Sequence, residues 1–294
     1  MTAFSRKPRS AEEARYRQML EKAPFFVWKR FADGEVLRVR MFAPQGHSPE
    51  AFAPAVMFYF GGMWALEQTA EFVSWAMHLS RRGIVCLLPE YRTPGRYDVT
   101  AEDIIAEGLD AWRWLHHNAG GLGIDVNRIT LAGSDAGGLM ALNAAMQPME
   151  EEHKWWRPGS KDVLPLQPAA VAIFRGVVDT DAPEARLLRV NTEVDHPERV
   201  NPCDLLRRKL PPLFCAHGML DPLLDYEMRV WFCEEWEKLG NTAEIVLCPA
   251  ADHTLTSFDV NPAVFEQILL GWDTFMVQQG IWPEDDMAFD ALME

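Results

Sequence analysis

The sequence lacks the features that mark membrane, secreted and nucleic-acid-binding proteins. No apolar run approaches the roughly 18 residues of a membrane-spanning helix, and residues 1–10 are basic and polar without the apolar core of a secretory signal. Basic residues are few: 28 Lys and Arg stand against 43 Asp and Glu, a formal net charge of −15. Such a charge repels a phosphate backbone. We therefore expect a cytoplasmic protein with no membrane and no nucleic-acid partner.

Cysteine is sparse, and no metal-binding spacing is present. The cysteines are odd in number and have no C-x-x-C pair, which favours buried thiols in a reducing compartment over the alternative of a disulfide framework. His116 and His117 are adjacent, so on a helix they point in different directions and cannot share one ion as an i,i+4 pair does. We predict no metal and no cofactor. The cysteines are Cys86, Cys203, Cys215, Cys233 and Cys248.

Short apolar runs alternate with helical patterns along most of the 294 residues. This alternation is typical of an α/β fold in which helices cover a mostly parallel sheet, and interior strands then read as continuous apolar stretches. The expected strands are 36–42, 55–60, 84–88, 129–132, 170–174, 213–216 and 243–248. The expected helices include 69–82, 101–118, 225–239 and 262–279.

We expect a single domain spanning 1–294, because no second boundary and no internal repeat is found. The segment 1–30 is interpreted as helical, with a capping box of Ser10 and Glu13 opening a helix over 10–22 that we expect to help cover the site. Two long polar stretches, 147–167 and 178–204, interrupt the alternation. Their length indicates lid insertions, with disorder as the alternative.

The segment 129–138, ITLAGSDAGG, carries the strongest functional signal. A strand pattern leads into small residues and then an apolar helix, the context of a G-x-S-x-G nucleophile elbow, in which flanking glycines permit a sharp turn that exposes the central side chain. Here Gly133 and Gly137 flank Asp135 and not a serine. Ser134 cannot replace it, because alanines would then occupy both glycine positions. An ordinary turn with an Asp helix cap is the alternative.

Further motifs stand in the order expected of one superfamily. They are FYFGGMW at 58–64, PEYR at 89–92, GIDVNRI at 123–129, HGMLDP at 217–222 and ADH at 251–253. Together with the elbow they resemble the α/β-hydrolase superfamily, within it the hormone-sensitive-lipase-like and carbohydrate-acetylesterase-like esterases. The resemblance runs from about Val36 to Gly280.

The resemblance implies roles for individual residues. Asp221 matches the acid that orients the histidine, and His253 matches the general base, in the chain order nucleophile, acid, histidine. Phe60 stands where the family commonly has histidine, and Met63 replaces a glycine. The backbone N–H groups implied for an oxyanion hole are those of Gly61, Gly62 and Ala136, and the implied substrate contacts are Met63, Trp64 and Ser134.

An aspartate at the elbow changes the chemistry that the site can perform. A carboxylate is a far better leaving group than an alkoxide, so its attack on an ester carbonyl reverts. We therefore expect an esterase-like hydrolase with a modified Asp135, His253 and Asp221 site and a small-molecule substrate. The alternatives are an Asp-nucleophile hydrolase of epoxides or haloalkanes, a non-catalytic binding protein, or an introduced substitution at Asp135. Assembly into a homo-oligomer is left open.

Overall fold

A computed structural model of the chain describes residues 10–65, 68–94, 96–147, 167–186, 188 and 200–284. Nearly all of the lid candidate 147–167 therefore lies outside the described residues, as does much of the second candidate, 178–204. Their proposed action as lids stays a prediction, as does the single-domain boundary 1–294.

The described residues form one sheet with the strand order β1-β2-β4-β3-β5-β6-β7-β8. The strands β3 to β8 run parallel, whereas β2 pairs antiparallel with both β1 and β4. This confirms the predicted mostly parallel α/β sheet. The strands are β1 (Phe25–Arg30), β2 (Val36–Phe42), β3 (Ala53–Tyr59), β4 (Val85–Pro89), β5 (Ile124–Ser134), β6 (Ala170–Phe174), β7 (Leu213–Gly218) and β8 (Ala243–Cys248).

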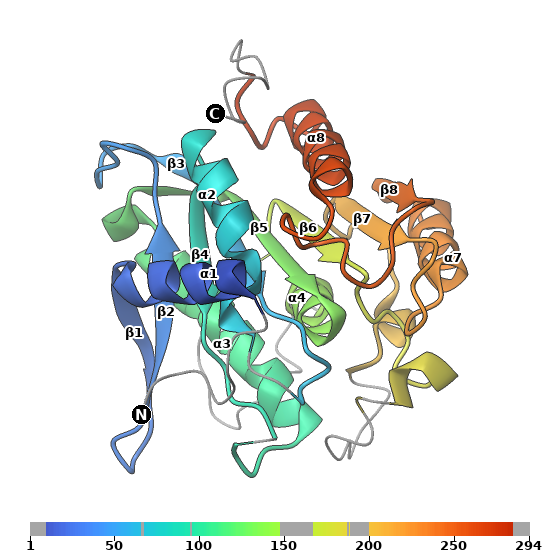
Figure 1. Cartoon of the computed structure of the whole chain (residues 1–294), viewed down its shortest axis with the longest axis horizontal. Coiled ribbons are helices and arrows are strands. Elements are labelled where there is room, and N and C mark those ends of the chain that lie inside the picture. The colour runs from blue at the N-terminus through green and yellow to red at the C-terminus, as the bar shows by residue number, and fades with distance from the viewer. Residues whose placement is uncertain are drawn as a thin grey trace.

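Helices cover both faces of the sheet (Figure 1), which gives the molecule two cores. One core holds buried side chains of α3, α4 and α7, and the other holds those of α1, α2 and α8. Successive side chains of β3 alternate between them, as the pleat requires. The helices are α1 (Ala11–Lys22), α2 (Val73–Arg81), α3 (Ala101–Asn118), α4 (Asp135–Met146), α7 (Tyr226–Lys238) and α8 (Pro262–Gln278).

Side-chain caps define where several helices begin. Thr100 and Asp103 form a complete capping box at the start of α3. Asn261 caps α8 and is followed by Pro262, whose missing N–H costs nothing in the first helical turn. The predicted role of Ser10 is confirmed in one half of the box, because its hydroxyl accepts from the Glu13 N–H at 2.9 Å. These caps place the helices where the apolar patterns indicated.

Two expectations about local structure were wrong. The segment 1–30 is not wholly helical, because β1 follows α1 and pairs antiparallel with β2. The strand begins with a short apolar run, residues 25–28, but it is half-exposed because it lies at the edge of the sheet. The helix expected over 69–82 is a 3-10 turn, η1 (Thr69–Phe72), followed by α2. Glu71 lies in η1, and its carboxylate contacts the Gly61 N–H and the Ser134 hydroxyl.

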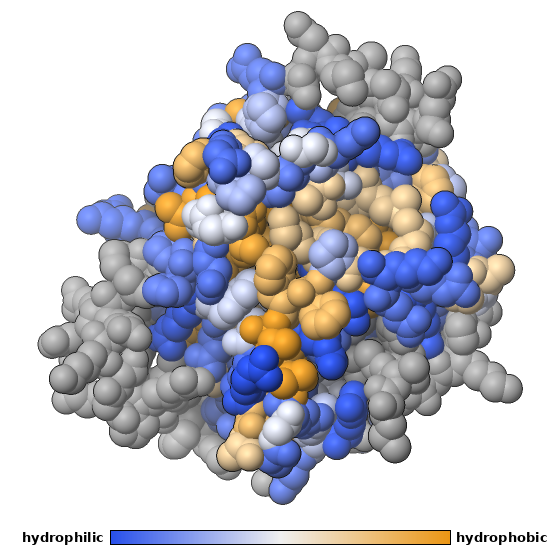
Figure 2. Space-filling view, turned by 90° about the vertical axis from the view of Figure 1, so that its left-hand side faces the viewer, coloured by the Kyte–Doolittle hydropathy of each residue, from blue (hydrophilic) through white to orange (hydrophobic). Residues whose placement is uncertain are grey.

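The β1 edge of the sheet exposes aromatic side chains. Phe25 and Phe26 are 50% and 37% exposed, and Figure 2 shows apolar surface between hydrophilic patches on this side of the molecule. The guanidinium groups of Arg38 and Arg40 lie over the Phe25 ring, 5.5 and 4.9 Å from its centroid. Cationic side chains next to an open edge strand oppose pairing with another sheet.

All of the cysteines are free thiols, and four of them are buried.

Among the helices that the structure describes, none combines the length and apolarity needed to cross a membrane.

Candidate active site

The junction of β5 and α4 forms a sharp turn with Asp135 at its centre. Asp135 has a φ of 46°, a left-handed conformation that costs a side-chain-bearing residue about 1 kcal/mol. A Cβ on Gly133 would lie 2.3 Å from the Gly137 backbone, and one on Gly137 would lie 2.1 Å from the Tyr59 carbonyl oxygen. Only glycine fits at both positions. The predicted elbow geometry is therefore present, and the cap-only alternative does not describe it.

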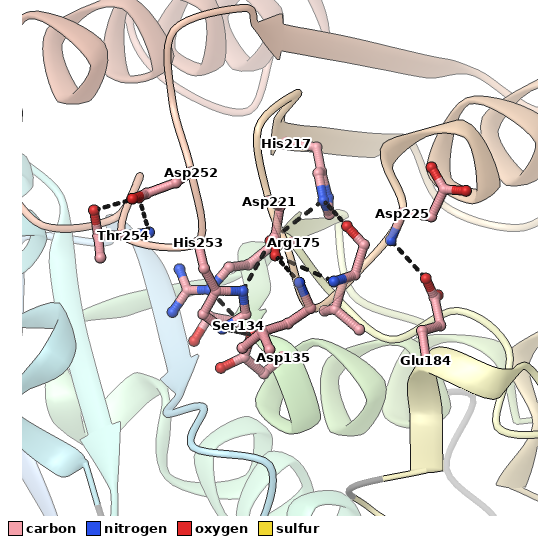
Figure 3. A network of polar contacts seen from close by, with 12 residues as sticks. Ser134, Asp135, Arg175, Glu184, His217, Asp221, Asp225, Asp252, His253 and Thr254 are labelled. Carbon is pink, nitrogen blue, oxygen red and sulfur yellow. Dashed lines mark hydrogen bonds and ion pairs between the residues drawn. The ribbon is translucent and has the colours of Figure 1, made fainter.

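The three residues proposed for catalysis meet at the carboxyl edge of the parallel part of the sheet, as predicted (Figure 3). The His253 Nδ1 lies 2.8 Å from Asp221 Oδ2, and its Nε2 lies 3.2 Å from Asp135 Oδ1. His253 follows β8 in the loop before α8, and Asp221 follows β7. Their convergence is confirmed, whereas their catalytic role stays a prediction.

Asp221 is a rigidly held, buried carboxylate. Its Oδ1 accepts hydrogen bonds from the N–H groups of Leu223 and Leu224, at 2.8 and 3.1 Å. The ring of His217 packs nearby, 3.5 Å from Asp221 Oδ2, and donates through Nε2 to the Leu224 carbonyl. Burial, followed by the Arg229 charge, lowers the pKa of His217 to about 4. His217 is therefore neutral at physiological pH. It does not form a charged pair with Asp221, whose charged partner is His253.

Asp135 is nearly inaccessible and is surrounded by donors. Its Oδ2 accepts from the Gly62 N–H at 3.2 Å, and its Oδ1 also lies 3.0 Å from Arg175 Nε, an ion pair without hydrogen-bond alignment. Burial alone would raise the pKa of Asp135, but the Arg175 charge, His253 and the Gly62 N–H outweigh it and lower the pKa. The carboxylate is therefore ionised at neutral pH.

The two carboxylates beside His253 favour its protonated form. Burial alone would lower its pKa, but the contacts with Asp135 and Asp221 raise the pKa to about 9. Burial also opposes ionisation of Asp221, yet its bond to His253 leaves its pKa below the ordinary value. At neutral pH the site thus contains an imidazolium that donates to Asp221 and forms an ion pair with Asp135.

Two of the three backbone groups proposed for an oxyanion hole already have partners within the chain. The Gly61 N–H donates to Glu71 Oε2 at 2.8 Å, so it does not point at Asp135. The Gly62 N–H bonds Asp135 itself. Ala136 lies in the first turn of α4, where backbone N–H groups have no intrahelical acceptor. The oxyanion role of these three residues stays a prediction.

The residues proposed to contact substrate are all buried. Met63 and Trp64 have φ values of 50° and 58°, so this turn is strained at two side-chain-bearing residues in succession. The Ser134 hydroxyl donates to Glu71 Oε1 at 2.8 Å. Substrate contact by these residues remains a prediction. Within the described residues, no group of three or more His, Cys, Asp or Glu is arranged to hold a metal ion.

Comparison with known proteins matches this geometry to one family. The family profile described as the alpha/beta hydrolase fold covers residues 56–257, well over half of the chain. The chain belongs to the α/β-hydrolase fold family. The matched segment includes the glycine loop, the elbow and all three proposed catalytic residues of this α/β hydrolase.

The relatives and structural neighbours of this α/β hydrolase include esterases. An ethyl acetate hydrolase of Pseudomonas putida is 31% identical over 117 residues, 39% of this chain and 36% of the relative. The carboxylesterase NlhH of Mycobacterium tuberculosis is 28% identical over 196 residues, 58% of this chain and 57% of the relative. These matches span less than two thirds of either relative.

A solved structure extends the similarity over almost the whole fold. The propionate-bound esterase Est2 of Thermogutta terrifontis has a TM-score of 0.79 at 27% identity, covering 90% of this chain and 97% of that one. The shared architecture is therefore that of an esterase-like α/β hydrolase.

Two charged residues of this site were missed by sequence reasoning. Arg175 directly follows β6, so its place at the carboxyl edge of a predicted strand was a usable signal. Glu71 lies within a pattern that predicts an ordinary surface helix, and nothing in the sequence indicates that it turns inward. Its Oε1 accepts from Arg175, Ser134 and Thr256, at 2.9, 2.8 and 3.2 Å.

Proposed function

We propose that this chain is an esterase-like hydrolase of a small ester or related substrate and works without a serine nucleophile. The observation that carries the proposal is His253, which lies between Asp221 and Asp135 with its ring nitrogens 2.8 and 3.2 Å from them. Hydrolysis requires a group that exchanges protons with water and with the leaving alcohol, and a histidine fixed by a buried carboxylate is such a group. The esterase-like fold supports this chemistry.

The substrate class is proposed from the relatives and from the site itself. One relative is named for the hydrolysis of ethyl acetate, and the solved neighbour holds propionate. Small acyl groups are therefore the first candidates for this chain. The buried site already contains the carboxylates of Asp135, Asp221 and Glu71, so we propose an uncharged ester and not an anionic one.

Water is the proposed nucleophile, because an acyl group transferred to Asp135 would return to the departing alkoxide. In this mechanism the active form is the one in which His253 has released its proton to solvent, and a water molecule lies between its Nε2 and the fixed Asp135 Oδ1. Neutral His253 takes a proton from the water as its oxygen attacks the ester carbonyl, and Asp221 stabilises the imidazolium formed. The tetrahedral intermediate then expels the alcohol, which takes the proton from His253. Ester and water thus become acid and alcohol.

A second candidate function is ligand binding without turnover. Two of the three proposed oxyanion donors, Gly61 and Gly62, are bonded to Glu71 and Asp135 of the chain itself. An oxyanion would have to compete with these carboxylates for the donors. A protein that binds a small molecule on a hydrolase scaffold fits this observation.

The first experiment compares the parent chain with His253→Gln on a panel of short activated esters. We expect the parent to hydrolyse at least one ester above the uncatalysed rate and the variant to lose that rate. If neither turns over any member of an ester, epoxide and haloalkane panel while a ligand still binds, the binding function replaces the hydrolase proposal. Turnover of an epoxide or haloalkane, with label from isotopic water appearing in the Asp135 carboxylate, would instead indicate an Asp nucleophile.

The second experiment substitutes Asp135→Ser, which places a hydroxyl beside His253. We expect hydrolysis of a short activated ester to rise by at least about a hundredfold, the lower end of what general-base catalysis contributes. Asp135→Ala is the matched control, because it removes the same carboxylate without adding a nucleophile. An equal rise in both variants would show that the lost charge, and not the hydroxyl, increased the rate.

A further inference from the structure

Arg175 is a buried cation that the proposed mechanism does not use. It directly follows β6, is 5% exposed, and adopts a φ of 46° although it is not glycine. Its N–H donates to the Ala216 carbonyl at 2.8 Å. A strained backbone persists only where surrounding contacts over-determine it, and such residues cluster at functional sites. The contacts of the Arg175 side chain are therefore expected to hold this strained backbone in place.

Each nitrogen of the guanidinium faces a different partner. Nη2 lies 2.9 Å from Glu71 Oε1, and Nη1 donates to Thr256 Oγ1 at 2.8 Å. Nε lies 3.0 Å from Asp135 Oδ1. A planar guanidinium held at two of its nitrogens cannot rotate, so the direction of the third is set.

Glu71 is itself held in place by the glycine loop and the elbow. Its two carboxylate oxygens accept from the Gly61 N–H and from the Ser134 hydroxyl, both at 2.8 Å. The Glu71 carboxylate of η1 thus bonds the loop after β3, the elbow and the end of β6, through Gly61, Ser134 and Arg175. Arg175 cannot move without breaking contacts on Glu71 and Thr256.

We propose that Arg175, held by Glu71 and Thr256, is a positioning residue that fixes the Asp135 carboxylate against His253 and the Gly62 N–H. The inference rests on the proposed function, since it assigns a role within that same site. A buried carboxylate without a counter-ion is strongly destabilising. The carboxylate of Asp135 therefore has a buried counter-ion, because the guanidinium of Arg175 lies 3.0 Å from its Oδ1.

The charge of Arg175 also acts on His253 through space. Arg175 opposes the rise in the pKa of His253 that Asp135 and Asp221 cause, and it lowers the pKa of Asp135. Removing that charge should therefore raise the pKa of His253 further. The titratable groups around His253 are Asp135 from α4, Asp221 and His217 from β7 and its loop, Glu71 from η1, and Asp252 beside it in the chain.

The test titrates the His253 ring by NMR in the full-length parent and in Arg175→Gln and Arg175→Lys. We expect an upward shift of about one unit in the glutamine variant, the size of effect that a nearby charge exerts, and recovery in the lysine variant. Arg82→Gln is the control, because Arg82 is also a largely buried partner of an aspartate, Asp273, but between α2 and α8. It should cost stability without moving the His253 titration.

A second measurement leaves Arg175 intact, so it is informative even where loss of this buried cation prevents folding. The Arg175 Nε–H resonance is compared between the parent and Asp135→Asn, which keeps the shape of the side chain and removes its charge. We expect the resonance to move in this variant, whereas Asp273→Asn, which makes the same change beside Arg82 and away from the site, should leave it unchanged. An unchanged resonance in Asp135→Asn, or an unchanged His253 titration in folded Arg175→Gln, overturns the inference.

Neither measurement needs turnover. A shifted His253 titration without ester hydrolysis would support the positioning role and reject the proposed reaction. Ester hydrolysis with an unchanged His253 titration would support the reaction and reject the positioning role.

Discussion

His253 forms a cluster with four other ionisable side chains, and their charges explain its protonation. Glu71, Asp135 and Asp221 are carboxylates, whereas Arg175 and the imidazolium are cations. With His253 protonated this group carries one negative charge, and without the proton it carries two. Because the group is buried, the additional charge is costly. The proton on His253 is thus retained by the whole group and not by a single partner.

The raised pKa of His253 predicts how stability depends on pH. Its folded-state pKa of about 9 exceeds its ordinary value of 6.5, so its contribution is fully present below pH 6.5 and is lost as the pH rises through 9. We expect this residue to reduce the free energy of unfolding over that window by on the order of 3 kcal/mol. Urea unfolding at a series of pH values measures it.

His253→Gln is the control for this pH prediction. The variant keeps every other titrating group, including the buried thiols, so the difference between the two pH profiles isolates His253. Equal slopes for the parent and the variant between pH 6.5 and 9 would contradict the raised pKa.

At the scale of elements, the site depends on how closely two backbone segments approach the elbow. Gly133 and Gly137 contact each other, Gly137 contacts the end of β3, and Gly138 contacts Gly176 just after β6. These approaches bring the glycine loop and Arg175 within reach of Asp135. A side chain at any of these positions would separate the elements that form the site.

The elbow glycines provide a test of this packing. Gly137→Ala places a methyl group 2.1 Å from the Tyr59 carbonyl oxygen, which neither backbone can avoid without moving. We expect a loss of about 3 kcal/mol in the free energy of unfolding, the upper part of the range for overpacking. Gly120→Ala is the control, because no atom lies within 4 Å of the added methyl group. Its stability should stay within about 0.5 kcal/mol of the parent.

At the scale of the whole molecule, the net charge of −15 surrounds a site that is also negative. Such a field repels anionic ligands over distances up to the Debye length, about 10 Å at 0.1 M salt. We therefore expect charge to favour neutral or cationic ligands over anionic ones before they reach Asp135 and His253.

Ionic strength tests this selection with esters that differ only in charge. Raising salt should increase kcat/KM for an anionic ester and decrease it for a cationic one, because screening weakens repulsion and attraction alike. A neutral ester of the same acyl group is the control and should change little. Identical salt dependence for the three substrates would exclude steering by the net charge.

Much of the fold and part of the site were predictable because their signals are local. Continuous apolar runs and the turn residues of segment 129–138 identified the parallel strands and the elbow. Asp221 and His253 were found because each follows a predicted strand in the expected order. The edge strand β1 was missed although residues 25–28 are all apolar, because so short a run does not distinguish a strand from a continuation of the preceding helical segment.

By itself the sequence determined the α/β class, the elbow and the presence of aspartate where the resemblance to esterases implies a serine. Only the tertiary structure decided what surrounds that aspartate. Glu71 and Arg175 are 104 residues apart in sequence, yet they form an ion pair beside Asp135. The reason is physical: hydrophobic patterning is read over a few residues, whereas a buried charge is stabilised by whichever partner the packed chain brings within about 3 Å of it.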